Sequence, residues 1–381
     1  MTRTTKIVFG IIIGVVILLI GWLIVNYLLV PSEPGGVQRT FLLFPSGGEE
    51  QPGSAGKEPT PKLSGEDEER LLQLTQDPVV GAALSQDRTH ILFYKRAGGN
   101  LFQIDLDGSN EAKLSNLTIL GILEAHWNAR RNAAIVAYAT DDETKYFVQT
   151  IATGSTTFLP RAITSAVWSP DGSRIGYTQI SSRGSDLVTA DGKGGSPRVI
   201  YSRKSPDWRV QWIGTTTILM TTTPSSVILA SSLFMTLGQG VAEFLSSPGL
   251  QILPAFPANT YAVFSTDERG IPQPLVFRKR SGELIATTDI KTLREKCAWD
   301  ESSTLLYCAV PEVTPPGLPD EWYKGKVHFR DRVVRINRAT GAYEDVLPTS
   351  QIDATDLFVS PDNKFLFFIR KSDSTLWRLQ L

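Results

Sequence analysis

The 381-residue chain has few side chains suited to covalent or metal chemistry, with two cysteines and three histidines. His90, His126 and His328 stand far apart, without the short spacing of metal-ligand motifs. The nucleophile motif Gly-x-Ser-x-Gly does not occur either. We therefore expect a protein that is not an enzyme and that needs no metal or other cofactor.

The chain also lacks a block of basic residues. Its 38 Lys and Arg are balanced by 39 Asp and Glu, which gives a net charge of −1. Because nucleic-acid binding depends on concentrated positive charge, we expect no nucleic acid among the partners.

One short phrase recurs in weakened form along the chain, and it is clearest in Trp168 to Tyr177. The residues equivalent to its Trp, here called anchors, follow one another at steps of 43, 41, 44, 44, 43 and 60 residues. The anchors are Leu84, Trp127, Trp168, Trp212, Phe256, Trp299 and Val359. Seven units of this length, each built from short apolar runs cut by turn signals, predict an all-β fold, a seven-bladed β-propeller.

The phrase contains the turn Ser169-Pro170-Asp171-Gly172, in which Pro presets φ and Gly tolerates positive φ. Trp168 to Tyr177, Val359 to Phe367 and Leu84 to Tyr94 together resemble the WD-like repeats of TolB-type β-propellers. This resemblance covers about Leu71 to Leu381. It implies a propeller in a cell-envelope setting, whereas the partner of TolB itself is not carried over.

The two ends of the repeat region predict how the ring closes. The last unit ends at Leu381 without a fourth strand, and Arg70 to Thr75 resembles the fourth-strand segments of other units. We expect these two segments to share one blade, which would leave no long free strand edge.

The stretch from Ile7 to Val30 contains 24 residues without a charge, about 36 Å as a helix. Because the hydrocarbon of a bilayer is about 30 Å thick, we predict a single transmembrane helix. The alternative is a cleaved signal peptide, but no small-residue cleavage site follows. Arg3 and Lys6 predict a cytoplasmic N-terminus and an extracytoplasmic propeller.

The segment Pro31 to Glu69 is rich in Pro, Gly, Ser and Glu, and it has too few apolar residues to form a core. We therefore divide the chain into a tip and membrane helix (1–30), a disordered linker (31–69) and the propeller (70–381).

Cys297 and Cys308 flank the first hairpin of the sixth unit. A turn centred on Glu301 and Ser302 would make them diagonal neighbours on one face of the two strands. The sequence leaves open a disulfide, which an oxidising compartment would favour, and two buried thiols.

The inner strands supply one candidate binding site, because alternating side chains of each strand face the central channel. This candidate channel ring comprises Glu124, His126, Arg209, Gln211, Lys296 and Asp356. Its charges either bind a ligand or neutralise one another, with Lys296 pairing with Asp356 on the next blade.

The sixth unit supplies a second candidate, the insertion Pro311 to Lys326, which adds about 16 residues to the usual length of a unit. Long insertions in regular scaffolds often carry function. The candidate recognition residues are Pro315, Pro316, Trp322, Tyr323 and Lys324. The alternative is that its aromatic side chains only cap the blade.

These observations favour a membrane-anchored, non-catalytic scaffold that binds a protein partner of the cell envelope. An enzyme or glycan-binding module that uses the channel is the alternative. Unpaired carboxylates or a cluster of histidines in the channel would favour that alternative, whereas mutual ion pairs would favour the scaffold.

Overall fold

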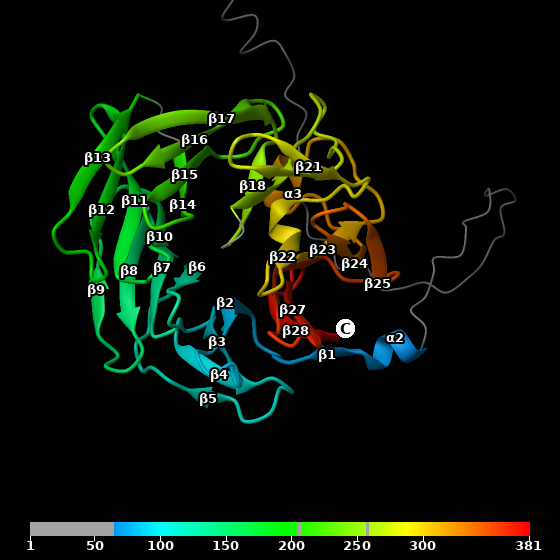
Figure 1. Ribbon diagram of the computed structural model, residues 1–381. Coiled ribbons are helices and arrows are strands. Elements are labelled where there is room, and N and C mark those ends of the chain that lie inside the picture. Colours follow the sequence, from blue (N-terminus) through cyan, green and yellow to red (C-terminus); the bar gives the residue numbers. More distant parts are fainter. Residues whose placement is uncertain (1–64, 205–207, 257–258) are drawn as a thin grey trace, which may run out of the picture. The chain divides into compact units, whose positions relative to one another are not determined.

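The computed structural model describes residues 65–204, 208–256 and 259–381. These residues form seven four-stranded antiparallel sheets arranged in a ring, so the predicted seven-bladed β-propeller is confirmed (Figure 1). Among them, no helix is long and apolar enough to cross a membrane. The predicted membrane helix and most of the predicted linker lie outside the described residues.

Each blade is a meander whose first strand lies next to the central channel. The first three blades contain β2 (Val79–Leu84), β3 (His90–Lys95), β4 (Leu101–Asp105) and β5 (Ala112–Lys113); β6 (Ile122–Trp127), β7 (Ala133–Ala139), β8 (Thr144–Thr150) and β9 (Thr156–Phe158); and β10 (Ile163–Trp168), β11 (Arg174–Ser181), β12 (Gly184–Asp191) and β13 (Arg198–Arg203).

The next three blades contain β14 (Trp208–Trp212), β15 (Thr217–Thr222), β16 (Leu229–Thr236) and β17 (Gly240–Pro248); β18 (Gln251–Ala255), β19 (Thr260–Phe264), β20 (Val276–Lys279) and β21 (Leu284–Thr287); and β22 (Cys297–Trp299), β23 (Leu305–Pro311), β24 (Asp331–Asn337) and β25 (Tyr343–Leu347). Short helices stand at α2 (Gly65–Glu69), η1 (Arg294–Lys296) and α3 (Asp320–Tyr323).

The seventh blade closes the ring with strands from both ends of the described chain. It orders β1 (Leu71–Gln73) beside β28 (Thr375–Gln380), then β27 (Phe365–Arg370) and β26 (Ala354–Val359). Leu71 pairs with Leu379 in the antiparallel register of β1 and β28. The closure predicted from the sequence is therefore confirmed.

The recurring Trp joins neighbouring blades. The indole of Trp127 donates to the Gly81 carbonyl at 2.7 Å, and that of Trp168 donates to the His126 carbonyl at 2.8 Å. In both pairs the acceptor lies on the inner strand of the preceding blade. The buried indole of Trp212 has no such acceptor among the described residues, so apolar packing is common to these anchors and the hydrogen bond is made by some of them.

The recurring turn is held by its own side chains. The Ser169 hydroxyl donates to Asp171 at 2.6 Å and accepts from the Arg174 amide at 2.9 Å, while Gly172 adopts a φ of 69°. These local bonds explain why the Ser-Pro-Asp-Gly phrase reverses the chain between the first two strands.

The hydrophobic core lies between the blades. One cluster joins Trp168 and Tyr177 of the third blade to Ile135 of the second, and another joins Phe93 of the first blade to Phe367 of the seventh. Each blade therefore packs on two neighbours, as it must in a closed ring.

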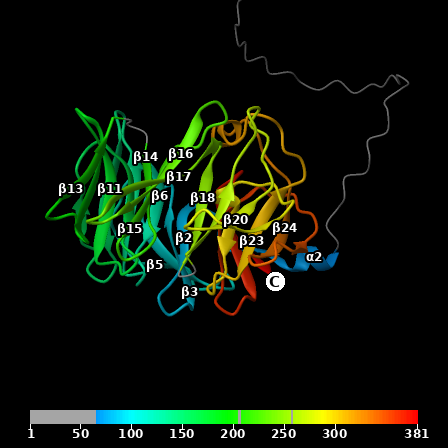
Figure 2. The ribbon, with the colours of Figure 1, turned by 45° about the horizontal axis from the view of Figure 1, so that its top comes forward.

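The antiparallel meander defines two faces of the ring. The turns between first and second strands emerge on one face, here called the turn face. The connections between second and third strands, and those to the next blade, emerge on the other, here called the insertion face because it carries residues 312–330. The described chain begins and ends at the turn face, where the Leu381 amide donates to the Lys364 carbonyl at 2.8 Å. Figure 2 shows α2 and the C-terminus close together.

Candidate functional site on the insertion face

The insertion folds back onto the propeller through the short helix α3. The hydroxyl of Tyr323 donates to Glu295 at 2.8 Å, and the Gln251 amide donates to the second Glu295 oxygen at 2.9 Å. Gln251 begins the inner strand of the fifth blade, and Glu295 precedes that of the sixth. In Figure 1, α3 lies beside the start of β22 and close to the channel.

Trp322 does not serve as an exposed recognition residue. It is 2% exposed, its indole donates to Asp353 at 3.0 Å, and it packs with Leu318 and Phe329. The prediction of two aromatic anchors on the surface is therefore wrong for Trp322. The insertion is long enough to fold back on itself, and burying the Trp322 side chain in this way removes its apolar surface from water.

The other predicted residues of the insertion remain accessible. Tyr323 is 40% exposed, Pro316 and Lys324 are exposed, and Pro315 is half-buried. Lys324 forms an ion pair with Glu321 at 3.3 Å. The insertion thus combines a buried inner side with a polar outer side.

Lys296 does not belong to the channel ring. It is fully buried, and its ammonium lies 2.8 Å from Asp331 and 2.7 Å from Asp353. The expected pair of Lys296 with Asp356 is therefore wrong. The helix η1 interrupts the strand alternation before β22, so Lys296 turns into the interface between the sixth and seventh blades.

Asp356 is the most distinctive residue of the channel. It adopts a left-handed φ of 52° beside a bulge in β26, and its side chain has no hydrogen bond or ion pair to a described residue. The Asp356 side chain is exposed to solvent. Partial desolvation by the protein around it, together with the charge of Glu295, raises the pKa of Asp356 to about 6.

The remaining ring residues divide into three kinds. The Nε2 atom of His126 lies 3.4 Å from a carboxylate oxygen of Glu124, and Arg209 is exposed. Burial acts to raise the pKa of Glu124, but the neighbouring His126 and Arg209 outweigh it and hold that pKa below its usual value. Gln211 is used structurally, because its amide donates to the Ile252 carbonyl of the next blade at 3.2 Å.

The charges at the channel mouth converge from several blades. His126, Arg96 and Arg294 each act electrostatically on Asp356, from the second, first and sixth blades. Sequence reasoning missed Arg294 and Glu295, since strand alternation counted back from Trp299 points to Lys296 instead. No signal in the sequence marks the helical turn that reverses this assignment.

A cavity of about 450 Å³ opens beside this mouth between the second and third blades. Its walls combine the apolar Leu123 and Ile180 with Glu124, Tyr146 and Arg209. Among the described residues, no group of three His, Cys, Asp or Glu side chains is placed to hold a metal ion.

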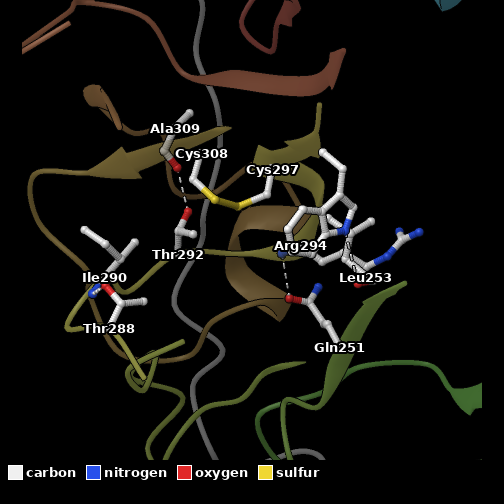
Figure 3. Close-up of a disulfide and its surroundings, with 10 residues drawn as sticks. Gln251, Leu253, Thr288, Ile290, Thr292, Arg294, Cys297, Cys308 and Ala309 are labelled. Atoms are coloured by element: carbon white, nitrogen blue, oxygen red, sulfur yellow. Dashed lines mark hydrogen bonds between the residues drawn. A yellow bond between two sulfur atoms is a disulfide. The ribbon is translucent and has the colours of Figure 1, made fainter. Parts of the chain in front are cut away.

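The two cysteines form a disulfide between β22 and β23, within the core cluster that joins the fifth and sixth blades (Figure 3). They pair directly across β22 and β23, with their Cα atoms 4.2 Å apart, so the predicted diagonal placement is wrong. The turn is centred one residue later than expected, because Ser303 takes the left-handed position with a φ of 55°.

The fold and this mouth define a seven-bladed β-propeller with a charged channel entrance. No family model matches the chain, and no relative is found among curated proteins. Solved structures of similar fold include the oligogalacturonate lyase of Vibrio parahaemolyticus, with 10% identity, 81% of this chain and 93% of that chain covered, and a TM-score of 0.60.

Two further solved structures are similar in fold to this chain. Hydrazine synthase of Kuenenia stuttgartiensis is 14% identical over 81% of this chain and 97% of that chain, with a TM-score of 0.58. The Cps50 (Swd1) propeller domain of Myceliophteria thermophila is 10% identical over 81% and 98%, with a TM-score of 0.57. At these identities the similarity shows the fold alone.

Proposed function

We propose that this protein is a non-catalytic scaffold of the cell envelope, held in the membrane by residues 7–30, that binds a protein partner through its insertion face. The WD-like turns and the uncharged stretch near the N-terminus support the envelope setting. The distribution of exposed apolar side chains supports the choice of face.

The observation that carries this proposal is the concentration of exposed apolar groups on one face. Nine of the fourteen large apolar side chains that are exposed in the described residues lie at the insertion-face ends of the strands or in the loops beyond them. They are Leu120, Leu123, Phe158, Ile180, Val227, Ile228, Leu229, Val313 and Tyr323. The other five lie at the turn-face ends, and they are Val199, Val241, Phe256, Leu284 and Tyr343. Exposed apolar patches mark interaction sites on soluble domains.

The run Val227 to Leu229 is the most exposed part of this patch, and Val227 itself is 85% exposed. The loop that carries it is fixed to the insertion, since the amide and hydroxyl of Ser226 donate to Asp320 at 2.6 and 2.8 Å. A loop held in place loses little conformational entropy when it binds, which favours affinity.

Site-specific photo-crosslinking of the full membrane-bound chain tests the proposal. A photoreactive residue at position 228 should give a discrete adduct, whereas one at position 199, on the outer strand β13, should give none. The double change Val227→Glu and Ile228→Glu should weaken capture at least about tenfold, equivalent to 1.4 kcal/mol, with an unchanged Tm. Equal adducts at both positions, or undiminished capture, would contradict the proposal.

A second candidate function, binding or catalysis in the channel, is favoured by the unpartnered Asp356. The lyase of similar fold shows by its name that such a scaffold can carry an enzyme. The change Asp356→Asn separates the two candidates. Under the scaffold proposal it leaves partner capture intact, whereas loss of capture would move the site into the channel.

A further inference from the structure

The turn face has a cavity of its own at the opposite end of the channel. Its volume is about 460 Å³, within the range of small-molecule sites, which runs from about 300 to 1,000 Å³. The walls expose apolar and polar surface in similar amounts, and the apolar part comes largely from the inner strands of the first, fifth, sixth and seventh blades. They include Leu84, Leu253, Trp299, Leu357 and Phe358.

Two arginines line the cavity from positions where arginine is conformationally unfavourable. Arg88 and Arg131 occupy the fourth position of the turn that follows the inner strand, with φ of 65° and 53°. The same position holds Gly172, Asn259, Ser303 and Asn363 in other blades. Glycine and asparagine tolerate this left-handed backbone best, so the two arginines occupy it at a conformational cost.

The two arginines differ in their partners. Arg88 forms an ion pair with Glu301 of the sixth blade, across the turn of the seventh. Arg131 is half-buried, and its side chain has no hydrogen bond or ion pair to any residue that the structure describes. The cavity therefore contains one uncompensated positive charge beside apolar walls.

A guanidinium binds a carboxylate through two parallel hydrogen bonds, and this interaction strengthens as water is excluded. The apolar walls have no negative charge to pair with Arg131, so the carboxylate must come from the ligand. The walls would then contact the apolar part of that ligand. We propose that the turn-face cavity binds an organic carboxylate that carries an apolar, ring-sized group, with the carboxylate on Arg131 and the ring between Trp299 and Leu357. A small acid and the C-terminal residue of a peptide share this chemistry.

This ligand site is independent of the proposed partner surface, because it lies on the opposite face of the ring. Its experiment uses the full chain in detergent, titrated with N-acetyl-phenylalanine and with the neutral N-acetyl-phenylalaninamide. We expect saturable binding of the acid and at least tenfold weaker binding of the amide. A tetrapeptide ending in Phe, with and without C-terminal amidation, distinguishes a peptide terminus from a small acid as the source.

Substitutions at Arg131 separate binding from folding. Arg131→Gln should weaken binding of the acid at least tenfold at an unchanged Tm. Arg131→Gly should do the same while raising the Tm slightly, because glycine relieves the left-handed backbone. The neighbouring exposed Arg130, changed to Gln, is the matched control and should bind as the wild type does.

A further variant tests the cavity itself. Ala129→Trp should fill the space and abolish binding while Arg131 remains in place. The proposal is overturned if the acid fails to bind, if acid and amide bind equally, or if Arg131→Gly and Arg130→Gln have the same effect on binding.

Discussion

Lys296 lies at the centre of a buried cluster that joins the insertion of the sixth blade to the propeller. Its ammonium is shared by Asp331 and Asp353, and it lies 5.3 Å from the ring of Trp322. Burial raises the pKa of Asp331 to about 6 even though Lys296 opposes this change. A buried charge is tolerated only when it is paired and hydrogen-bonded, so this cluster depends on every member being in place.

Trp322 is the member of this cluster whose loss is simplest to interpret. Trp322→Ala should lower the free energy of unfolding by about 3 kcal/mol or more, because it opens a cavity and removes the hydrogen bond to Asp353. Tyr323→Ala, at a 40% exposed position, should cost much less. Urea unfolding of the full chain measures both. Similar losses for the two variants would mean that the insertion is not held by its indole.

At the scale of elements, the short strand β1 has the largest consequence. It covers the edge of β28 with three residues, and the Leu74 amide continues the pairing by donating to Leu376 at 2.8 Å. Leu74 is buried in the cluster that joins the first and seventh blades. Because β1 completes the blade that closes the propeller, we expect the stability of the ring to depend strongly on this short strand.

Deleting Arg70 to Thr75 should therefore open the ring and expose β28 as a free edge. We expect the Tm to fall by at least about 5 °C, since several kcal/mol of packing and hydrogen bonding are lost. Deleting the longer segment Gln51 to Pro61, in the predicted linker, is the control and should change the Tm little. Thermal unfolding followed by circular dichroism compares the two. Equal effects would refute the importance of the closure.

At the scale of the whole molecule, the two faces of the ring have different surroundings. The described chain enters at the turn face, where the Gln380 amide donates to the Arg70 carbonyl at 2.9 Å. The apolar patch and the insertion lie on the opposite face. A ligand bound at the turn face and a partner bound at the apolar patch therefore do not compete for the same surface.

The predicted membrane orientation can be tested on spheroplasts, which are cells from which the outer layers have been removed. Because Arg3 and Lys6 favour a cytoplasmic N-terminus, protease added to spheroplasts should release a fragment that begins between Pro31 and Glu69. Immunoblotting of the soluble fraction detects this fragment. A propeller that becomes accessible only after lysis would reverse the assigned orientation.

The sequence by itself determined the seven blades and the closure of the ring. The turn at Ser169 to Gly172 forms from neighbouring side chains, and the anchor Trp168, like Trp127, bonds to the blade before it. Both are local or periodic features, so they can be read without knowing what surrounds them.

Only the tertiary structure decided which residues face the channel and which face of the ring is apolar. Lys296 turned away from the channel because η1 breaks the strand before β22, and Trp322 turned inward because Phe329 and Asp353 lie beneath it. Arg131 became notable only when its turn proved to border a cavity. The direction of a side chain in an irregular segment depends on what packs against it, and sequence spacing does not contain that information.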